Sequence, residues 1–187
     1  AAGVAGVPDG TPLSVNYATT QAYMRQEVAK LLAASLTECG IQVNVQYYDP
    51  AELYAPGPEG MMFGRQFDLV QYAWGSGSQP PCLFYESSQT PSPANNWLGI
   101  NVTGYSSPEF DAACQAARYA RVDNTAAYTE NHQAAQRIFA ADLPVVPLYY
   151  RTAVTLARPD LCGLNMDITA RSALWNLEAL GYGELCP

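Results

Sequence analysis

The stretch LSVNYATTQAYMRQEVAKLLAASLTECGIQVNVQY, residues 13–47, decides the fold. Apolar and polar residues alternate from Leu13 to Tyr17 and again from Ile41 to Tyr47, which is the period of a half-buried strand. The residues between them predict a helix that begins at a Thr20 cap and ends at Gly40. Its expected buried stripe is Met24, Val28, Leu31, Leu32 and Leu36. Two strands joined by one helix are expected to be parallel, with a right-handed crossover.

Further elements follow along the chain. Asp49-Pro50 predicts a short helix that Pro56-Gly57-Pro58 breaks, and residues 67–74 (FDLVQYAW) predict a buried strand. Ser107-Pro108-Glu109 predicts a helix start, with a cap, a proline in the first turn and an acid that complements the helix dipole. Another helix is expected to begin at Asp123 or Asn124. The side chains expected to face the core from this helix are Tyr128, Ala135, Ile138 and Phe139. Strands are expected at residues 143–150, at a sheet edge, and at residues 153–156.

The segment after the Trp74-Gly75 turn is a candidate ligand wall. Residues 76–101 have almost no hydrophobic periodicity, and a connection of that length is usually functional or disordered. Tyr85 and Trp97 within it argue against plain disorder. Tyr72 and Trp74 alternate with Ala73, so they are expected to face the same side. Trp74, at the end of the strand, either presents a flat apolar surface to a ligand or serves as a core residue.

Composition bounds the class of protein. The chain has 187 residues and a net charge of −8, with Lys30 as the only lysine, which argues against nucleic acid and anionic membrane surfaces as partners. No apolar run approaches the ~18 residues that span a bilayer. The single histidine, His132, and the dispersed acids predict no metal site, no cofactor and no catalytic triad.

Five cysteines predict an oxidising compartment, with one or two disulfides and a thiol left over. The favoured pairs are Cys162 with Cys186, which would fasten the C-terminal tail, and Cys82 with Cys114, which would tie the long loop to the helix after it. Sequence alone does not fix this connectivity. Cys39 is then expected to be a buried free thiol.

Four motifs, in order, resemble the C-terminal part of the family 5 extracellular solute-binding proteins, the peptide- and nickel-type receptors of ABC importers. Residues 36–43 (LTECGIQV) look like the family's "L…GI.V", and residues 67–74 are similar to its "FD…W" strand. Residues 101–111 (NVTGYSSPEFD) resemble "N..GYS.PEFD", and residues 142–150 (DLPVVPLYY) resemble "D.P..PLY". Together the motifs cover residues 12–164.

The resemblance implies an α/β fold: a type II periplasmic-binding-protein-like lobe with a mixed, mostly parallel sheet flanked by helices. Residues 1–10 would be a linker or the cut end of a longer chain, 11–151 the lobe and 152–187 a returning C-terminal tail. The family holds its ligand between two lobes, so a first lobe would be missing here.

The resemblance also implies a function without catalysis. The expected role is an extracytoplasmic solute-binding domain, secreted or lipid-anchored, that delivers a small polar or amphipathic solute to the membrane subunits of an ABC importer. The match places Trp74, Gly75 and Ser76 at the cleft. Peptide-binding members commonly carry an aspartate shortly after that tryptophan, whereas residues 75–80 contain no acid, which leaves the solute open.

Other residues of the long loop are weaker candidates. Tyr85 and Trp97 either contact solute or anchor the loop, and Asn95, Asn96 and Asn101 offer amide hydrogen bonds or ordinary turn chemistry.

Two alternatives stay open. One is an extracellular hydrolase with Glu86 and Asp111 as paired acids. The other is a protein-interaction module whose exposed cleft face leads the fragment to self-associate.

Overall fold

The computed structural model describes residues 6–75, 80–120, 124–152, 154–167, 169–170, 172 and 174–186. These residues divide into two compact units, one made of residues 6–75 and 80–145 and the other starting at Val146. The expected boundary between lobe and tail was residue 151, so the last residues of the expected lobe fall in the second unit.

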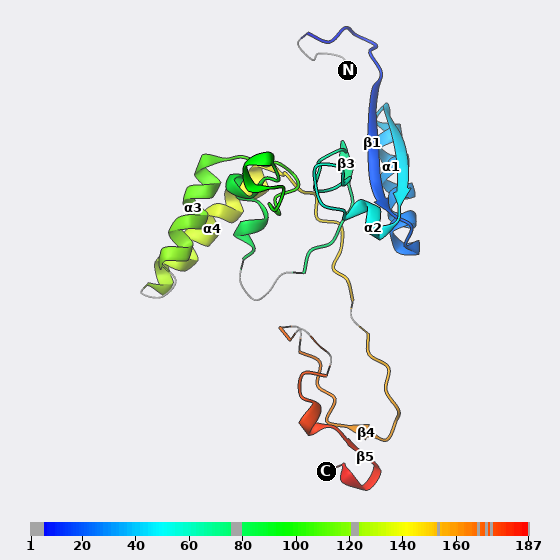
Figure 1. The fold of residues 1–187 in the computed structure, drawn as a ribbon, viewed down its shortest axis with the longest axis vertical. Helices are drawn as coiled ribbons and strands as arrows, with labels where there is room; N and C mark the ends of the chain where they lie inside the picture. The colour runs from blue at the N-terminus through cyan, green and yellow to red at the C-terminus, as the bar shows by residue number, and fades with distance from the viewer. Residues whose placement is uncertain are drawn as a thin grey trace. The chain divides into compact units, whose positions relative to one another are not determined.

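Three parallel strands form the sheet of the first unit, in the order β2-β1-β3 (Figure 1). Their bounds are Leu13–Thr20 for β1, Ile41–Tyr48 for β2 and Leu69–Val70 for β3. Leu13 pairs with Ile41 on one side of β1, and Tyr17 pairs with Leu69 on the other. The predicted pair of parallel strands is therefore confirmed. The prediction of a buried strand over residues 67–74 is wrong in length and burial, because the pairing is limited to Leu69–Val70 at the sheet edge and Leu69 is 40% exposed.

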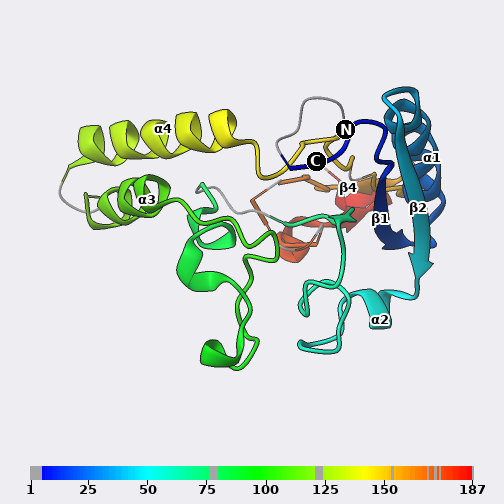
Figure 2. The same ribbon diagram turned by 90° about the horizontal axis from the view of Figure 1, so that it is seen from above.

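Helix α1, Tyr23–Glu38, connects β1 to β2 and packs against both (Figure 2). Its predicted end is confirmed, because the Gly40 N–H donates to the Thr37 carbonyl at 2.9 Å and Gly40 has a φ of +80°. Its predicted start is wrong. Thr20 is the buried last residue of β1, and Ala22 holds the N-cap position with no side-chain hydrogen bond.

The buried face of α1 is narrower than its apolar stripe. Ala29 is the buried residue of this helix, whereas Met24 and Leu31 are 58% and 70% exposed. The prediction that Met24 and Leu31 are buried is wrong, because a sheet of three strands is too narrow to cover both edges of the stripe.

The remaining helices of the first unit begin as their sequences predict. The Asp49 side chain accepts a hydrogen bond from the Ala51 N–H and starts α2, Pro50–Leu53. The Ser107 hydroxyl accepts from the Phe110 N–H at the start of α3, Pro108–Ala120. Asn124 caps α4, Thr125–Asp142, while Asp123 lies outside the described residues.

Helices α3 and α4 pack side by side (Figures 1 and 2). Their shared core contains Cys82, Phe110, Cys114 and Ala135, with Ile138 and Phe139 packed against it. None of the helices within the described ranges is long and apolar enough to cross a bilayer.

The strand predicted at residues 143–150 does not form. Leu143 ends α4 in a left-handed conformation, with a φ of +46°, and residues 146–150 are irregular. Pro144 and Pro147 lack the N–H groups that a sheet ladder needs, so the apolar run cannot pair through them. Residues 154–156 are also without strand pairing, and Ala153 lies outside the described residues.

The second unit is small and held by local contacts. Two short antiparallel strands, β4 (Leu161–Cys162) and β5 (Gly181–Tyr182), form its ladder. The Asn176 side chain donates to the Gly163 carbonyl at 2.8 Å. Gly163 has a φ of +76°, and a Cβ there would lie 1.9 Å from the Ala179 carbonyl oxygen, so this turn requires glycine.

Two disulfides, Cys82–Cys114 and Cys162–Cys186, join the pairs favoured from the sequence. Cys39 is free, as expected, but it is exposed rather than buried. It sits at the C-cap of α1, in the turn to β2, where the sheet covers little of the chain.

Candidate functional site

The site begins where β3 leaves the sheet. The Gln71 N–H donates to the Ala18 carbonyl at 2.9 Å, and the buried Gln71 side-chain oxygen accepts from the Tyr17 and Thr19 hydroxyls. Arg25 of α1 donates to the Gln71 carbonyl at 3.0 Å. These contacts hold the chain rigidly just before Tyr72 and Trp74.

Tyr72 and Trp74 lie on the same side of the chain, as their alternation with Ala73 predicts. Their ring centroids are 5.5 Å apart in an edge-to-face arrangement. Trp74 is half-buried, and Gly75 after it is exposed. Ser76, the third predicted cleft residue, lies outside the described residues.

A continuous row of rings runs from the end of β3 to α4. The Trp74 indole stacks on Phe84 at 5.0 Å, Phe84 meets Tyr85 edge-on at 6.4 Å, and Tyr85 contacts Phe139 at 4.5 Å. We call Tyr72, Trp74, Phe84, Tyr85 and Phe139 the aromatic row. Burial raises the pKa of both tyrosine hydroxyls, so the row is uncharged at neutral pH.

Two polar atoms of the row are buried without ordinary hydrogen bonds. In the described part of the chain, neither the Trp74 Nε1–H nor the Tyr72 hydroxyl forms a hydrogen bond within the usual distance and angle limits. Both atoms are closed to solvent, and the Tyr72 hydroxyl interacts with the side chains of Trp74 and Tyr85 within the row.

A cavity of about 250 Å³ lies at the other end of the row, between the 80–85 turn and helices α3 and α4. Its lining is mostly apolar: Pro80, Pro81, Cys82, Tyr85, Phe110, His132, Ala135, Gln136 and Phe139. Tyr85 is the predicted ligand residue that reaches this cavity, whereas Trp74 lies outside its lining.

The other predicted loop residues have partners within the loop. Asn95 forms a reciprocal capping box with Ser92 and donates to the Thr90 carbonyl. Trp97 has a φ of +60° and packs so tightly on Gly57 that a Cβ on that glycine would lie 2.6 Å from the indole. These contacts give both residues a role in fixing the loop, whether or not they also reach a ligand.

Asn101 is the anchor of the long loop. Its fully buried side-chain amide donates to three carbonyls, those of Tyr85, Glu86 and Tyr105, at 2.9–3.2 Å. It also lies 3.3 Å from the Thr90 hydroxyl. A single amide thus closes the loop behind the aromatic row.

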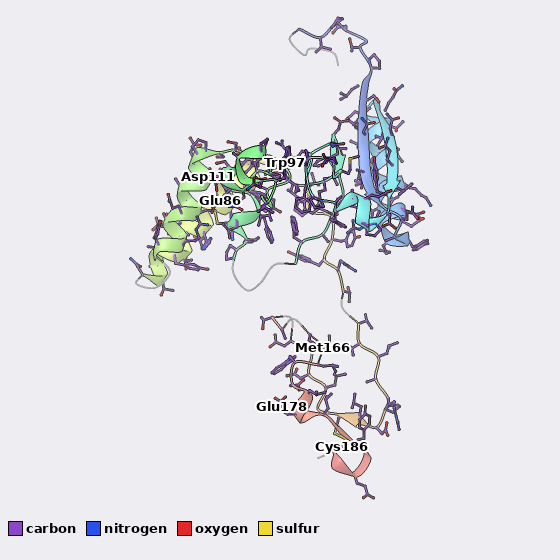
Figure 3. All side chains as sticks on the ribbon, viewed as in Figure 1. Glu86, Trp97, Asp111, Met166, Glu178 and Cys186 are labelled. Carbon is purple, nitrogen blue, oxygen red and sulfur yellow. A yellow bond between two sulfur atoms is a disulfide. The ribbon has the colours of Figure 1, made fainter. Side chains whose placement is uncertain are left out.

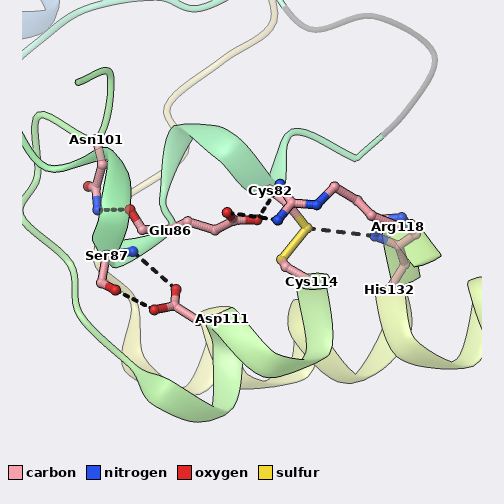
Figure 4. A network of polar contacts seen from close by, with 8 residues as sticks. All are labelled: Cys82, Glu86, Ser87, Asn101, Asp111, Cys114, Arg118 and His132. Atoms are coloured by element: carbon pink, nitrogen blue, oxygen red, sulfur yellow. Dashed lines mark hydrogen bonds and ion pairs between the residues drawn. A yellow bond between two sulfur atoms is a disulfide. The ribbon is translucent and has the colours of Figure 1, made fainter. Parts of the chain in front are cut away.

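A polar network backs the row (Figure 4). Glu86, which is 5% exposed, pairs with Arg118 of α3 at 2.9 Å. Asp111 accepts from the Ser87 N–H at 3.0 Å and from the Ser87 hydroxyl. Glu86 and Asp111, labelled in Figure 3, are the acids of the hydrolase alternative, and each already has a partner that fixes the loop on α3.

Sequence reasoning missed Phe84, Phe139 and Arg118. Phe139 was expected to face inward on α4, but nothing in the sequence indicated that Tyr85 would be its neighbour. Phe84 and Arg118 acquire their partners only through the fold of residues 80–101, which lacks any periodic signal.

The fold is similar to that of solved binding proteins. The chain aligns with an oligopeptide-binding protein from Thermus thermophilus, solved with a pentapeptide, at 25% identity and a TM-score of 0.64 over 74% of this chain and 24% of that one. It aligns with the oligopeptide-binding protein AppA of Bacillus subtilis, solved with a nonapeptide, at 19% identity and a TM-score of 0.74. This alignment covers 95% of this chain and 35% of AppA. It aligns with NikZ of Campylobacter jejuni, solved with Ni(L-His), at 19% identity and a TM-score of 0.67. This alignment covers 93% of this chain and 34% of NikZ.

These neighbours are family 5 solute-binding proteins, so the resemblance carried by the four motifs is confirmed at the level of the fold. The chain spans about a quarter to a third of the length of these structures. No protein-family model and no curated protein matches the sequence.

Proposed function

We propose that this chain is the C-terminal lobe of a solute-binding protein that serves an ABC importer. The observation that carries the proposal is the segment that follows β3: hydrogen bonds hold Gln71 in place, and Trp74, three residues further on, belongs to an uncharged aromatic row. Neighbours of the same fold were solved with a pentapeptide, a nonapeptide and a nickel–histidine complex, which supports a role in holding small solutes.

Binding would use ring contacts first. Trp74, which is half-buried, would supply a flat apolar face. Gly75 is exposed, and among the described residues no heavy atom lies within 4 Å of a Cβ placed on it, so a ligand could approach the backbone there. Tyr85, Asn95, Trp97 and Ser76 complete the proposed set of ligand residues.

The solute is proposed to be neutral where it meets this lobe. Described residues 72–75 and 80–85 carry no ionisable acid or base apart from two tyrosines, and burial keeps those protonated. A free peptide amino group would find no carboxylate in this part of the wall. A polar or amphipathic solute that presents an aromatic or apolar face would fit it better.

One lobe offers one wall. Most of a ligand is buried only between two walls, so the isolated chain is expected to bind more weakly than micromolar, and a first lobe is proposed to complete the cleft. Membrane subunits of an importer and an extracytoplasmic location, with or without a lipid anchor, belong to the same proposal. Two disulfides support an oxidising compartment.

The test is a solute panel on the natural protein that contains this chain. Calorimetry would follow a pentapeptide, a nonapeptide, nickel–histidine and a disaccharide, first with the unaltered protein and then with Trp74→Ala. We expect at least one member to bind and Trp74→Ala to weaken it about tenfold or more, as loss of a stacked aromatic anchor does. Trp175→Ala, in the second unit, is the matched control and should leave affinity unchanged.

Two outcomes would contradict the proposal. One is a solute whose affinity is the same before and after Trp74→Ala. The other is chemical turnover of a bound solute that stops when Glu86 and Asp111 are both replaced by their amides, which would favour the hydrolase alternative.

Exposed apolar residues favour one secondary property, self-association of the isolated chain. Tyr23, Met24 and Leu31 of α1 are 74%, 58% and 70% exposed, and a second copy of the chain would cover such apolar surface in a dimer. Sedimentation at several protein concentrations would show a rising molecular mass if these residues mediate a dimer.

A further inference from the structure

Strand β2 lies at an open edge of the sheet in the first unit (Figure 2). β1 lies between β2 and β3, and β2 pairs with β1 alone among the described residues. All eight residues of β2, Ile41–Tyr48, are in register with β1, so the free edge is roughly 25 Å long. The unpaired N–H and C=O groups of such an edge can hydrogen-bond to another strand.

Strand β2 lacks the features that usually stop an edge from pairing. Its sequence, IQVNVQYY, contains no charged residue, no proline and no glycine, and its continuous register with β1 contains no bulge. Charged side chains, prolines and bulges are what soluble proteins place on exposed edges. The opposite edge is different, because β3 has only two residues. The sheet therefore offers one long edge to a further strand.

The backbone groups that face this edge follow from the contacts of β1. The Ala18 carbonyl accepts from the Gln71 N–H at 2.9 Å, on the β3 side of β1. Successive residues of a strand direct their N–H and C=O groups to opposite sides, so those of Tyr17 face β2. In a parallel pair the residue in register with Tyr17, which is Val45, then directs its own groups away from β1. The outward-facing residues of β2 are therefore Ile41, Val43, Val45 and Tyr47.

We propose that β2 pairs with β2 of a second copy of this chain, antiparallel and about a two-fold axis that passes beside Asn44. The two sheets then join into one continuous sheet. In this register Ile41 lies opposite Tyr47 of the second copy, and Val43 lies opposite Val45 of the second copy. Every outward N–H between Ile41 and Tyr47 thereby finds a carbonyl of the other copy.

The side chains favour the same register. On the face that α1 covers, apolar Val43 meets apolar Val45 of the second copy. On the open face, Gln42 meets Gln46 and Asn44 meets Asn44, so exposed amides lie opposite exposed amides. No like charges oppose each other, although the chain carries a net charge of −8. A shift by one residue would set outward-facing backbone groups against inward-facing ones, which cannot hydrogen-bond.

Helix α1 supports this arrangement. It packs on both β1 and β2, so the two copies of α1 would lie about two strand spacings, or roughly 10 Å, apart across the axis. That separation is typical of packed helices. The contact would cover Tyr23 and Leu31, which are 74% and 70% exposed.

The charges on α1 also fit a contact between two copies. A hydrogen bond to Glu27 is the main cause that raises the pKa of Lys30, and Tyr47 of β2 adds to it, which places Lys30 on the β2 side of the helix. Glu27 and Lys30 form an ion pair at 2.6 Å within one chain. Each helix therefore brings one acid and one base to the axis, and the contact opposes no net charge.

The assembly is expected to stop at two copies. Pairing uses β2 of both chains, and the edges that remain are β3 strands of two residues each. One strand and one side of a helix per chain amount to fewer than the roughly 20–30 residues of a standard interface, so we expect a dissociation constant in the micromolar range. No residue of the aromatic row belongs to α1 or β2, so the pairing does not depend on the proposed solute.

Disulfide trapping tests the register directly. The full chain would carry Cys39→Ser with Asn44→Cys, so that its one free thiol lies beside the axis. Opposed residues of an antiparallel pair have Cα atoms about 4.5–5.5 Å apart, which a disulfide can span. We expect mild oxidation to give a covalent dimer on a non-reducing gel. Gln42→Cys with Cys39→Ser is the matched control, because the two copies of residue 42 would lie roughly 13 Å apart and should not cross-link.

A charge swap tests the same pairing without a covalent bond. Asn44→Lys and Asn44→Asp each set like charges opposite each other and should weaken dimerisation about fivefold, whereas an equimolar mixture of the two should recover it. Ser14→Lys, on the same face of β1 but one strand away from the axis, is the control and should dimerise as the unaltered chain does. Sedimentation velocity over a concentration series measures the dissociation constants, and circular dichroism checks that each variant is folded.

Three results would overturn the proposal. One is Asn44→Cys that cross-links no faster than Gln42→Cys. Another is unaltered chain that stays monomeric up to about 1 mM. The third is a dimer that neither charge at position 44 weakens, which would assign self-association to another surface, such as the exposed side of α1 alone. None of these results bears on solute binding, which Trp74→Ala tests separately.

Discussion

The Trp74 indole lies almost flat against the Phe84 ring, with centroids 5.0 Å apart and planes inclined by 23°. The two residues are separated by the 76–79 segment, so this contact closes a loop and couples the end of the sheet to the first turn of the long connection. Removing the Phe84 ring should therefore change the surroundings of the Trp74 indole more than removing the neighbouring Leu83 side chain does.

Phe84→Ala tests that coupling. We expect a loss of about 2 kcal/mol in the free energy of unfolding, from the lost stack and the lost burial of a half-buried ring. The tryptophan emission should move to longer wavelength, because the Trp74 face becomes wet. Leu83→Ala is the matched control, since Leu83 is 46% exposed and should cost far less. If Phe84→Ala and Leu83→Ala change stability and emission equally, the Trp74–Phe84 stack does not stabilise the fold beyond an ordinary contact.

Asn101→Leu should be among the most damaging changes in the loop. It leaves the carbonyls of Tyr85, Glu86 and Tyr105 without their shared donor in a buried place. Each unsatisfied group costs about 1–3 kcal/mol, so the unit is expected to unfold at much lower urea concentration or not to fold at all. Asn44→Leu on the exposed face of β2 is the comparison and should change the urea midpoint little.

The Cys82–Cys114 disulfide closes a span of 32 residues. Chain entropy predicts that replacing both cysteines by serine lowers the free energy of unfolding by about 3–4 kcal/mol. Cys39→Ser should have nearly no effect, because this thiol is exposed and unpaired. Urea denaturation of the three proteins under oxidising conditions measures both quantities. A small effect of the double change would mean that the polar network around Glu86 already fixes the loop.

His132 should make stability depend on pH. Burial lowers its pKa in the folded protein, so the unfolded chain binds the proton more readily. Stability contributed by neutral His132 is therefore present above its ordinary value of about 6.5 and is lost as the pH falls through the folded-state value. Unfolding of the oxidised protein at pH 7.5 and pH 5, compared with His132→Gln, should show a smaller decrease in the variant. A decrease of the same size in both proteins would assign it to other groups.

Much of the fold could be predicted where the signal is local. Alternation located β1 and β2, and the pairs Asp49-Pro50 and Ser107-Pro108 located the starts of α2 and α3, because each motif acts within one turn of chain. The 143–150 run was misjudged since apolar composition does not distinguish a strand from an irregular segment. Pro144 and Pro147 have no backbone N–H groups, so the segment cannot form the hydrogen bonds that a strand needs at these positions.

The candidate site was less predictable because its contacts are long-range. Alternation placed Tyr72 and Trp74 on one side, which the 5.5 Å separation of their rings confirms. The pairing of Glu86 with Arg118, and the approach of His132 to Cys82, depend on how residues 80–101 wrap onto α3 and α4. No spacing in the sequence encodes that wrapping.

The exposed sulfur of Cys39 makes the protein easy to equip with a reporter. The other four cysteines are oxidised in pairs, so a maleimide dye would attach at one place, in the turn between α1 and β2. Energy transfer to a second dye on the proposed first lobe would then test whether the two lobes approach each other when a solute binds.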